Sequence, residues 1–574
     1  MRHLSYFLFL AIAISVSCTE ETGKKAELKT YCNPLDLEYR YQFGDPSYRE
    51  AADPTVVMFR DIYFLFASKT GGYWYSADLH DWKLVETDML PVEDYAPAAI
   101  PIGDTLYFAA SSGEAMPFYK SVDPVSGEWE VACDTFNWPV WDPAFFMDDD
   151  ERLYLYWGCS NENPLYGIEL DYRNGFRPIG EITVCFNSDQ INHGWERPGD
   201  INELSRRPWI EGPWMNKFNG KYYLQYAAPG TEFNSYADGV YVSDHPLGLF
   251  HYQEHNPFSL KVGGFSNGAG HGNTFADRYG NLWHTATIAI SNYHLFERRL
   301  AIFPAEIDKE GILYATTVFG DYPYYIPGKK VESIDDLYTG LNLLSYGKSV
   351  SSSPGIDSLS LSNIVDENIQ TFWAANTGNH GEWVILDLGE IMNVQAIQVN
   401  FYDFRTEIKG RLKGSSYQFT IEGSSDQDDW FMISDMSSNE KDSPHFYRYL
   451  DEPVKTRFIK LTNVHFPSGN FCISDLRIFG KGNGERPNPP GKVFIKSGGD
   501  PTEYIISWEK SNEATGYNLR YGIAEEKLYH SRLVYSDTSV LLTGLNSGSE
   551  YFLKVDAFNE NGVSGDGVMV SFGK

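Results

Sequence analysis

A short segment of this chain occurs in five related copies, and that repeat limits the folds open to it. Each copy begins with a polar or small residue followed by Pro or Gly, runs into an apolar stretch, and after a turn reaches a strand rich in Tyr or Trp. The second residues of the copies, spaced 43, 46, 69 and 60 residues apart, are Asp53, Ala96, Asp142, Glu211 and His271. Such a period, with several short strands per unit, is typical of propeller blades. The sequence therefore predicts an all-β chain that begins with a five-bladed β-propeller.

The repeat also predicts which polar side chains meet in the central channel. The first strand of each blade lines the central channel, so equivalent positions face one another across the axis. We therefore expect Asp53, Asp142 and Glu211 in one pocket, with His271 beside them. Hydrolysis of a glycosidic bond needs one carboxylic acid and one carboxylate on either side of a cleft, and a third carboxylate raises the pKa of the acid. The alternative, in which Asp-Pro only opens a strand, explains one copy but not three aligned copies.

The order of these motifs resembles a known family. Ala-Asp-Pro at residue 52, Trp-Asp-Pro-Ala at 141, Glu-Gly-Pro at 211 and Gly-His-Gly at 270 are similar to glycoside hydrolase family 43, over residues 30–327. The resemblance implies an inverting glycosidase in which Asp53 is the general base, Asp142 modulates a pKa and Glu211 is the general acid. It implies an α-L-arabinofuranoside as substrate, then a β-D-xyloside, then a galactose- or galactofuranose-containing glycan.

Other residues are expected to contact the substrate. The family resemblance gives His271 a role in orienting a pocket group or in contacting a channel cation through water; the alternative is a core histidine. Arg298 aligns best with the family's substrate-contacting arginine, and an alignment shifted by one residue would select Arg299 instead. The alternative role for this arginine is a surface salt bridge. The aromatic candidates for stacking on sugar, each with a core position as the alternative, are Trp74, Tyr95, Trp141 and Trp209.

The net charge of the chain limits the classes of partner that it can bind. The chain has 46 Lys and Arg against 78 Asp and Glu, a net charge of −32. Such a surface repels nucleic acid and anionic membranes and suits a neutral polysaccharide or oligosaccharide. No cofactor is required for the expected chemistry, although the resemblance allows a structural Ca²⁺ in the propeller channel or in a later domain. The sequence leaves the oligomeric state open.

The N-terminus predicts export. Residues 1–17 have the charged start and short apolar core of a signal peptide. Ser17-Cys18 then resembles a bacterial lipoprotein junction with Cys18 as the lipidated residue, although Ser15 replaces the usual Leu and leaves ordinary signal peptidase as the alternative. The acidic run that follows resembles the surface-export signals of Bacteroidetes lipoproteins. We expect an exported protein, either an outer-membrane or cell-surface lipoprotein or a periplasmic one, that meets a membrane only through this anchor.

Two further domains are expected after the propeller. Residues 335–482 resemble a discoidin (factor 5/8 type C) jelly-roll with Trp373 and Trp383 as framework residues, and either sugar binding or bracing of the propeller as its role. Residues 488–574 resemble a fibronectin type III sandwich, interpreted as a spacer. The long interval before the fourth copy, residues 187–207, is expected to shape subsites. Its Glu196 is interpreted as a solvated charge.

Two functions from other classes remain open at this stage. A propeller that has lost catalysis could serve as a glycan-binding surface protein, or the propeller could be a scaffold whose binding end is the discoidin domain. Both leave the matched set of carboxylates unexplained, since a lectin has no need of an acid and a base. The sequence therefore favours an enzyme.

Overall fold

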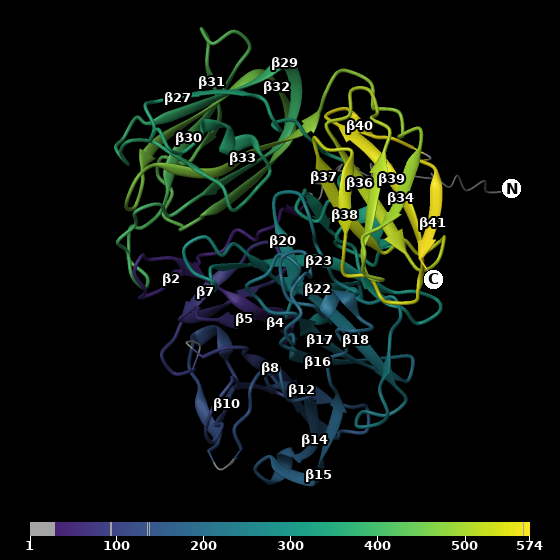
Figure 1. The fold of residues 1–574 in the computed structure, drawn as a ribbon. Coiled ribbons are helices and arrows are strands. Elements are labelled where there is room, and N and C mark those ends of the chain that lie inside the picture. The colour runs from purple at the N-terminus through teal and green to yellow at the C-terminus, as the bar shows by residue number, and fades with distance from the viewer. Residues whose placement is uncertain (1–28, 92–93, 135, 137, 566, 574) are drawn as a thin grey trace, which may run out of the picture.

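The computed structural model describes residues 29–91, 94–134, 136, 138–565 and 567–573 of the chain. The predicted signal peptide, residues 1–17, and the lipidation site Cys18 lie outside these residues. Figure 1 shows three all-β domains: a propeller below, coloured purple to teal, with a green and a yellow domain side by side above it. Within the described residues, no helix is long and apolar enough to cross a membrane.

The five repeats form five antiparallel blades, which confirms the predicted fold class. Blade one is β4 (Ala52–Phe59), β5 (Ile62–Ser68), β6 (Gly72–Ser76) and β7 (Lys83–Glu86). Blade two is β8 (Ala98–Ile102), β9 (Thr105–Ala109), β10 (Phe118–Ser121) and β11 (Glu130–Cys133). Blade three is β12 (Ala144–Met147), β13 (Leu153–Trp157), β14 (Leu165–Asp171) and β15 (Arg177–Phe186).

The last two blades follow the same plan. Blade four is β16 (Glu211–Phe218), β17 (Lys221–Ala228), β18 (Ala237–Ser243) and β19 (His251–Tyr252). Blade five is β20 (Asn267–Gly270), β21 (Thr274–Ala276), β22 (Leu282–Ala289), β23 (Arg298–Ile307) and β24 (Leu313–Ala315). Outside the blades, β1 (Lys29–Tyr31) pairs with β25 (Tyr324–Ile326), and β2 (Arg40–Tyr41) pairs with β3 (Arg49–Glu50).

Aromatic side chains pack between neighbouring blades, and hydrogen bonds between blades five and one close the ring. Phe66 of blade one packs against Phe108 and Trp129 of blade two, with ring centroids 5.3 and 6.1 Å away. Asn273 of blade five bonds both backbone groups of Val56 in blade one, at 2.8 and 2.9 Å. These bonds satisfy buried backbone groups where the circle of blades closes.

The second domain is one large antiparallel sheet system. Its strands are β26 (Asn342–Leu343), β27 (Ser349–Ser352), β28 (Trp373–Ala374), β29 (Trp383–Phe401), β30 (Gln418–Ser424), β31 (Phe431–Asp435), β32 (His445–His465) and β33 (Cys472–Lys481). Trp373 is buried in its core and Trp383 is half-buried. Trp373 agrees with the expected buried framework residue, whereas Trp383 lies outside the core cluster of this domain.

The third domain is a sandwich of two sheets. One sheet holds β34 (Val493–Ser497), β35 (Tyr504–Trp508) and β38 (Ser539–Leu542). The other holds β36 (Gly516–Gly522), β37 (His530–Tyr535), β39 (Glu550–Asn559), β40 (Gly562–Val563) and β41 (Met569–Gly573). Five short 3₁₀ helices complete the described elements: η1 (Pro124–Ser126), η2 (Tyr172–Asn174), η3 (Gly194–Glu196), η4 (Ile334–Leu337) and η5 (Leu361–Val365).

The three domains share one apolar cluster. It joins Phe319 and Tyr322 at the end of the propeller to Phe479 of the second domain and to Leu533 and Phe558 of the third. Beside it lies a buried ionic network. Arg477 of the second domain is 0% exposed, bonds Glu367 at 2.7 Å, and lies 3.7 Å from Asp321 of the propeller end.

Replacing Arg477 with Met is expected to destabilise the protein by about 3–5 kcal/mol, because it leaves two buried carboxylates without their guanidinium. The control is Arg457→Met, whose partner Asp387 is part-exposed. That loss is expected to cost at most about 1 kcal/mol. Denaturant unfolding followed by tryptophan fluorescence measures both. Equal shifts for the two variants would contradict the role given to the buried network.

The third domain packs on the propeller rather than spacing it from something else, so the prediction of a spacer was wrong. The segment 187–207 supplies much of this contact: the amide of Gly194 bonds the carbonyl of Leu545 at 3.1 Å, and Arg197 pairs with Asp500 at 3.0 Å. Glu196 is 0% exposed instead of solvated, since it accepts hydrogen bonds from the hydroxyl of Tyr226 and a backbone amide. The insertion therefore docks a domain, which its sequence did not indicate.

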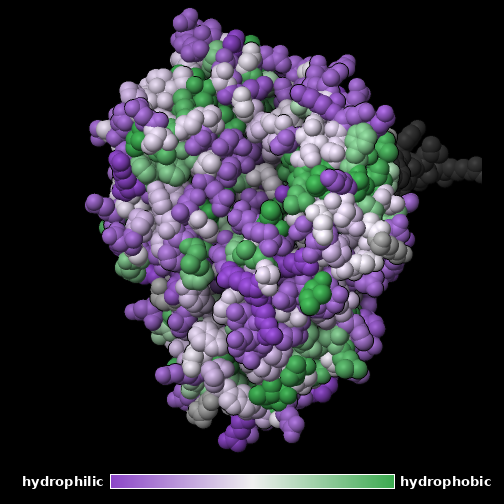
Figure 2. All heavy atoms as spheres, in the orientation of Figure 1, coloured by the Kyte–Doolittle hydropathy of each residue, from purple (hydrophilic) through white to green (hydrophobic). Residues whose placement is uncertain are grey.

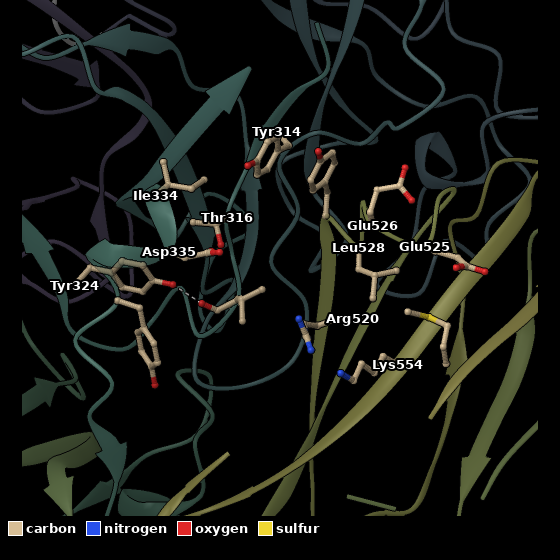
Figure 3. Close-up of a pocket in the computed structure, with 14 residues that line it drawn as sticks. Tyr314, Thr316, Tyr324, Ile334, Asp335, Arg520, Glu525, Glu526, Leu528 and Lys554 are labelled. Carbon is tan, nitrogen blue, oxygen red and sulfur yellow. Dashed lines mark hydrogen bonds between the residues drawn. The ribbon is translucent and has the colours of Figure 1, made fainter. Parts of the chain in front are cut away.

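A pocket of about 540 Å³, open to solvent, lies at the boundary between the propeller and the third domain. Figure 3 shows Tyr314 and Asp335 from the propeller side facing Arg520 and Lys554 of the third domain across this space. The face in Figure 2 is mostly hydrophilic, with hydrophobic residues in scattered groups, as expected of a strongly acidic chain.

Candidate active site

Backbone geometry marks the equivalent position of each blade. A positive φ between 45° and 58° recurs once per blade, just before or at the start of the inner strand, at Asp53, Ala96, Asp142, Gly212 and His271. The predicted alignment placed Glu211 in this series and was wrong by one residue. Left-handed backbone is uncommon outside Gly, and strained positions of this kind gather at functional sites. In blade four Gly takes the strained position, and Glu211 precedes it.

The three predicted carboxylates nevertheless meet in one pocket, around one imidazole. The Nδ1 atom of His271 lies 3.4 Å from Asp53, 3.8 Å from Asp142 and 4.0 Å from Glu211. All four residues are 5–9% exposed. Gly212 permits this approach, because a Cβ there would lie 2.5 Å from the His271 ring. The structure therefore brings together the residues that the sequence singled out.

Asp53 is held in its ionised form. Burial opposes ionisation, but the guanidinium of Arg298, the imidazole of His271 and a hydrogen bond from Ser68 at 2.6 Å outweigh it and lower the pKa of Asp53. Its backbone amide donates to Thr287 at 2.9 Å, which fixes the strained residue in place. An ionised carboxylate with these supports can accept a proton from water.

The surroundings of Glu211 favour its protonated form. Burial, reinforced by the charge of Asp142, raises the pKa of Glu211 to about 7. The hydroxyl of Tyr236 donates to Oε1, and the thiol of Cys159 lies 3.2 Å from Oε2. Burial also raises the pKa of Asp142, which bonds Ser111 at 3.2 Å and the amide of Gly212 at 3.2 Å. The lowered pKa of Asp53 and the raised pKa of Glu211 are thus pushed apart, as in a pair of a general base and a general acid.

Arg298 contacts Asp53 and is 2% exposed. Its Nη atoms bond Glu50 at 2.6 Å, Asp53 at 3.3 Å and Thr231 at 3.0 Å. The structure shows a contact of Arg298 with the carboxylate of Asp53. The predicted contact with substrate stays a prediction. Glu50 is a fourth buried carboxylate that the sequence reasoning missed, although it stands only three residues before Asp53.

The four aromatic residues that were expected to stack on sugar differ in their exposure to solvent. Trp74 is 1% exposed in the core of blade one, so its ring offers no face to a sugar and that prediction was wrong. Trp141 and Trp209 are 49% and 40% exposed and belong to the segments that lead into Asp142 and Glu211. Tyr95 is half-buried, with its ring 5.8 Å from the guanidinium of Arg298. Strand alternation could not settle which aromatic rings face outward.

Three supporting residues carried no sequence signal of their own. Ser68 bonds Asp53, and Tyr236 and Cys159 bond Glu211, yet serine, tyrosine and cysteine at such spacings are common in any β-strand protein. The described cysteines are all free. The Ca²⁺ allowed by the resemblance stays a prediction.

Comparison with known proteins agrees with this geometry. Residues 47–313 match the model of "Glycosyl hydrolases family 43". The propeller belongs to this family. Residues 348–475 match the F5/8 type C domain and residues 488–571 the fibronectin type III domain, which confirms the predicted order of domains.

Curated relatives of the family 43 domain have related names. A "Beta-xylosidase" of Xylanibacter ruminicola is 25% identical over 24% of this chain and 44% of its own length. A "Beta-D-galactofuranosidase xynD" of Aspergillus niger is 28% identical over 25% and 38%. A "Xylosidase/arabinosidase" of Bacteroides ovatus is 29% identical over 24% and 43%. The chain thus spans less than half the length of each of these three relatives.

Proposed function

We propose that this protein is an inverting glycoside hydrolase that removes terminal sugars from a polysaccharide or its side chains, with α-L-arabinofuranoside as the preferred substrate. One observation carries the proposal: Asp53 and Glu211 approach the same imidazole, while their surroundings push their pKa values in opposite directions. General acid and base catalysis of glycoside hydrolysis needs such a pair.

The mechanism follows from the two protonation states. Asp53 accepts a proton from a water molecule as that water attacks the anomeric carbon. Glu211 gives its proton to the departing glycosidic oxygen, so that the leaving group departs as an alcohol. Arg298 and His271 favour the ionised form of Asp53 by their positive charge. Burial, reinforced by the charge of Asp142, favours the protonated form of Glu211.

The leaving sugar is proposed to lie on the side of Trp141 and Trp209. Both indoles are exposed and belong to the segments that carry Asp142 and Glu211, where the proton is delivered. The apolar C–H faces of sugars stack on such rings. The names of the relatives support pentose or furanose substrates, so β-D-xyloside and β-D-galactofuranoside are the alternatives.

We also propose export, on the pattern of residues 1–17 and Ser17-Cys18. Metabolic labelling with a clickable palmitate analogue, compared between wild type and Cys18→Ala, tests the lipid anchor. Labelling of both, or of neither, would contradict it.

A panel of 4-nitrophenyl glycosides tests the activity. It holds α-L-arabinofuranoside, β-D-xyloside, β-D-galactofuranoside and β-D-galactoside, each with wild type and Glu211→Gln. We expect release of 4-nitrophenol from the arabinofuranoside by wild type. Silence across the panel and on arabinan, combined with retention on a polysaccharide affinity gel by both proteins, would instead support a non-catalytic glycan-binding protein.

The pH profile of kcat/KM is expected to be bell-shaped and to fall on its alkaline side near pH 7. Glu211 must be protonated, and its pKa is raised to about 7, so activity is lost as pH rises through that value. Asp53 must be ionised, and its pKa is lowered from 3.8, so activity is lost on the acid side only below about pH 4. Initial rates from pH 3 to 9 measure both limbs. A profile flat up to pH 9 would contradict the assignment of Glu211.

A further inference from the structure

The second domain contacts the segment that leads to the catalytic base. Arg49, on β3 of the propeller, is 0% exposed, and its Nε atom bonds Asp403 of the second domain at 3.0 Å. One of its Nη atoms bonds Asp442 of the same domain, also at 3.0 Å. The next residue along the chain is Glu50, which bonds Arg298 at 2.6 Å. The second domain therefore fixes the backbone beside the carboxylate that holds Arg298.

A second contact reaches the chain next to Arg298 itself. Arg299, the following residue on β23, is 1% exposed and donates from Nε to Nε2 of His445 at 2.9 Å. His445 begins β32 of the second domain, and its Nδ1 atom lies 2.8 Å from Oδ1 of Asn400. An amide oxygen only accepts, so Nδ1 carries the ring proton and Nε2 is left to accept from the guanidinium. Burial and two nearby guanidinium groups lower the pKa of His445, which keeps the ring neutral.

The two contacts are connected inside the propeller. One Nη atom of Arg299 donates to the carbonyl oxygens of Arg49 and Arg298, at 2.9 and 3.0 Å. The backbone amide of Ala51 donates to the same carbonyl of Arg298, at 3.3 Å. The side chain of Arg298 in turn bonds Asp53 at 3.3 Å. The two chain segments beside the base are thus one hydrogen-bonded unit, and residues of another domain hold it.

The base depends on this unit because charges of both signs surround it. Among its neighbours, Arg298 contributes most to lowering the pKa of Asp53, followed by His271. The other titratable groups near Asp53 are Glu50, Tyr95, Asp142, Cys159, Glu211 and Tyr236. The carboxylates among them oppose its ionisation. Displacement of Arg298 is therefore expected to raise the pKa of Asp53.

We propose that the second domain positions the catalytic base, and that His445 is the residue through which it holds Arg298 against Asp53. The proposal rests on the function proposed above and adds a positioning residue to it. His445 is 1% exposed and acts through Arg299, without contact to the substrate. Bracing of the propeller, one of the two roles expected of this domain, thereby gains a catalytic consequence.

The pH profile of kcat/KM for variants of the full chain tests this role. His445→Phe keeps a ring but cannot accept the bond from Arg299. It is expected to lower kcat/KM by about 10–100-fold, because a displacement of about 1 Å at a catalytic group can cost about 10²-fold. The loss is expected to be larger at pH 4 than at pH 6, since Asp53 then ionises less readily, while the alkaline limb set by Glu211 stays in place.

Two further variants separate positioning from a general defect. His445→Gln offers an amide oxygen to Arg299 and is expected to restore the wild-type profile. The matched control is His465→Phe, at the exposed far end of the same strand β32, which is expected to leave the profile unchanged. Circular dichroism at each pH corrects the rates for the folded fraction. A corrected loss that is equal at all pH values, or is the same in His445→Gln, would overturn the proposal.

A variant at the first contact covers a failure of His445→Phe to fold. Asp403→Asn weakens the bond to Arg49 and is expected to give the same selective loss at low pH. An unchanged profile in Asp403→Asn would then overturn the proposal.

Hydrogen exchange followed by mass spectrometry separates this inference from the proposed function. In His445→Phe the amides of residues 49–53 and 298–300 are expected to exchange faster than in wild type, and in His465→Phe at the wild-type rate. Unchanged exchange in His445→Phe would overturn the inference even where hydrolysis is lost. If wild type hydrolyses no glycoside, the proposed function fails, and the exchange rates still decide whether the second domain holds the segments beside Asp53.

Discussion

Replacing Glu211 with Gln is expected to lower kcat/KM for a glycoside with a poor leaving group, such as an arabino-oligosaccharide, by about 10²–10⁴-fold, the range that general acid catalysis contributes. Gln keeps the shape and can still accept the hydrogen bond from Tyr236, but it has no acidic proton to deliver. Stopped assays of released sugar measure the loss.

The leaving group provides the decisive comparison for this variant. A 2,4-dinitrophenyl glycoside departs without protonation, so the loss on that substrate is expected to be far smaller than on the oligosaccharide. The matched control is Glu203→Gln, an exposed residue of the segment 187–207, which is expected to retain activity within about twofold. An equal loss on both substrates would remove Glu211 from the role of general acid.

Replacing Asp53 with Asn is expected to lower kcat/KM by about 10²–10⁴-fold, and by the same factor on activated and unactivated substrates. Attack by water is required whichever group leaves, so a good leaving group cannot compensate for the lost base. The same stopped assays, run with both substrates, measure this loss. Asp53 also neutralises part of the charge of Arg298, which retains its bond to Glu50 at 2.6 Å in the variant.

The control for Asp53 is Asp81→Asn, a residue of blade one with an exposed carboxylate, which is expected to change activity by less than about twofold. If Asp53→Asn lost activity on the oligosaccharide but kept it on the 2,4-dinitrophenyl glycoside, it would behave as an acid variant. The roles of Asp53 and Glu211 would then have to be exchanged.

The propeller fold and the meeting of the three carboxylates could both be predicted from the sequence, because both follow from its repeated motif. Asp-Pro opens the inner strands of blades one and three, Ala-Pro that of blade two and Gly-Pro that of blade four, and His-Gly stands in blade five. A propeller turns that linear repeat into a ring around one axis. The single-residue error at Glu211 arose because sequence alone could not show which residue of Glu-Gly-Pro takes the positive φ. Only the backbone conformation distinguishes Gly212 from its neighbour.

Other features could not be predicted from the local sequence pattern, because they depend on which distant residues pack against them. Trp74 and Trp141 read alike along the chain, yet one fills the core of a blade and the other is half exposed. No local signal marks Glu196 as buried; its partner Tyr226 lies 30 residues away, on the strand β17. The docking of the third domain likewise rests on contacts between segments hundreds of residues apart, such as Arg197 with Asp500.

The configuration of the first product tests the central claim most directly. Proton NMR of the anomeric region, recorded in the first minutes of hydrolysis and before mutarotation, identifies the sugar released from an α-L-arabinofuranoside. If Asp53 activates water on the face opposite to the bond that Glu211 protonates, the first product is the β-anomer. Initial release of the α-anomer would show retention, and would contradict the assignment of Asp53 as a base acting on water.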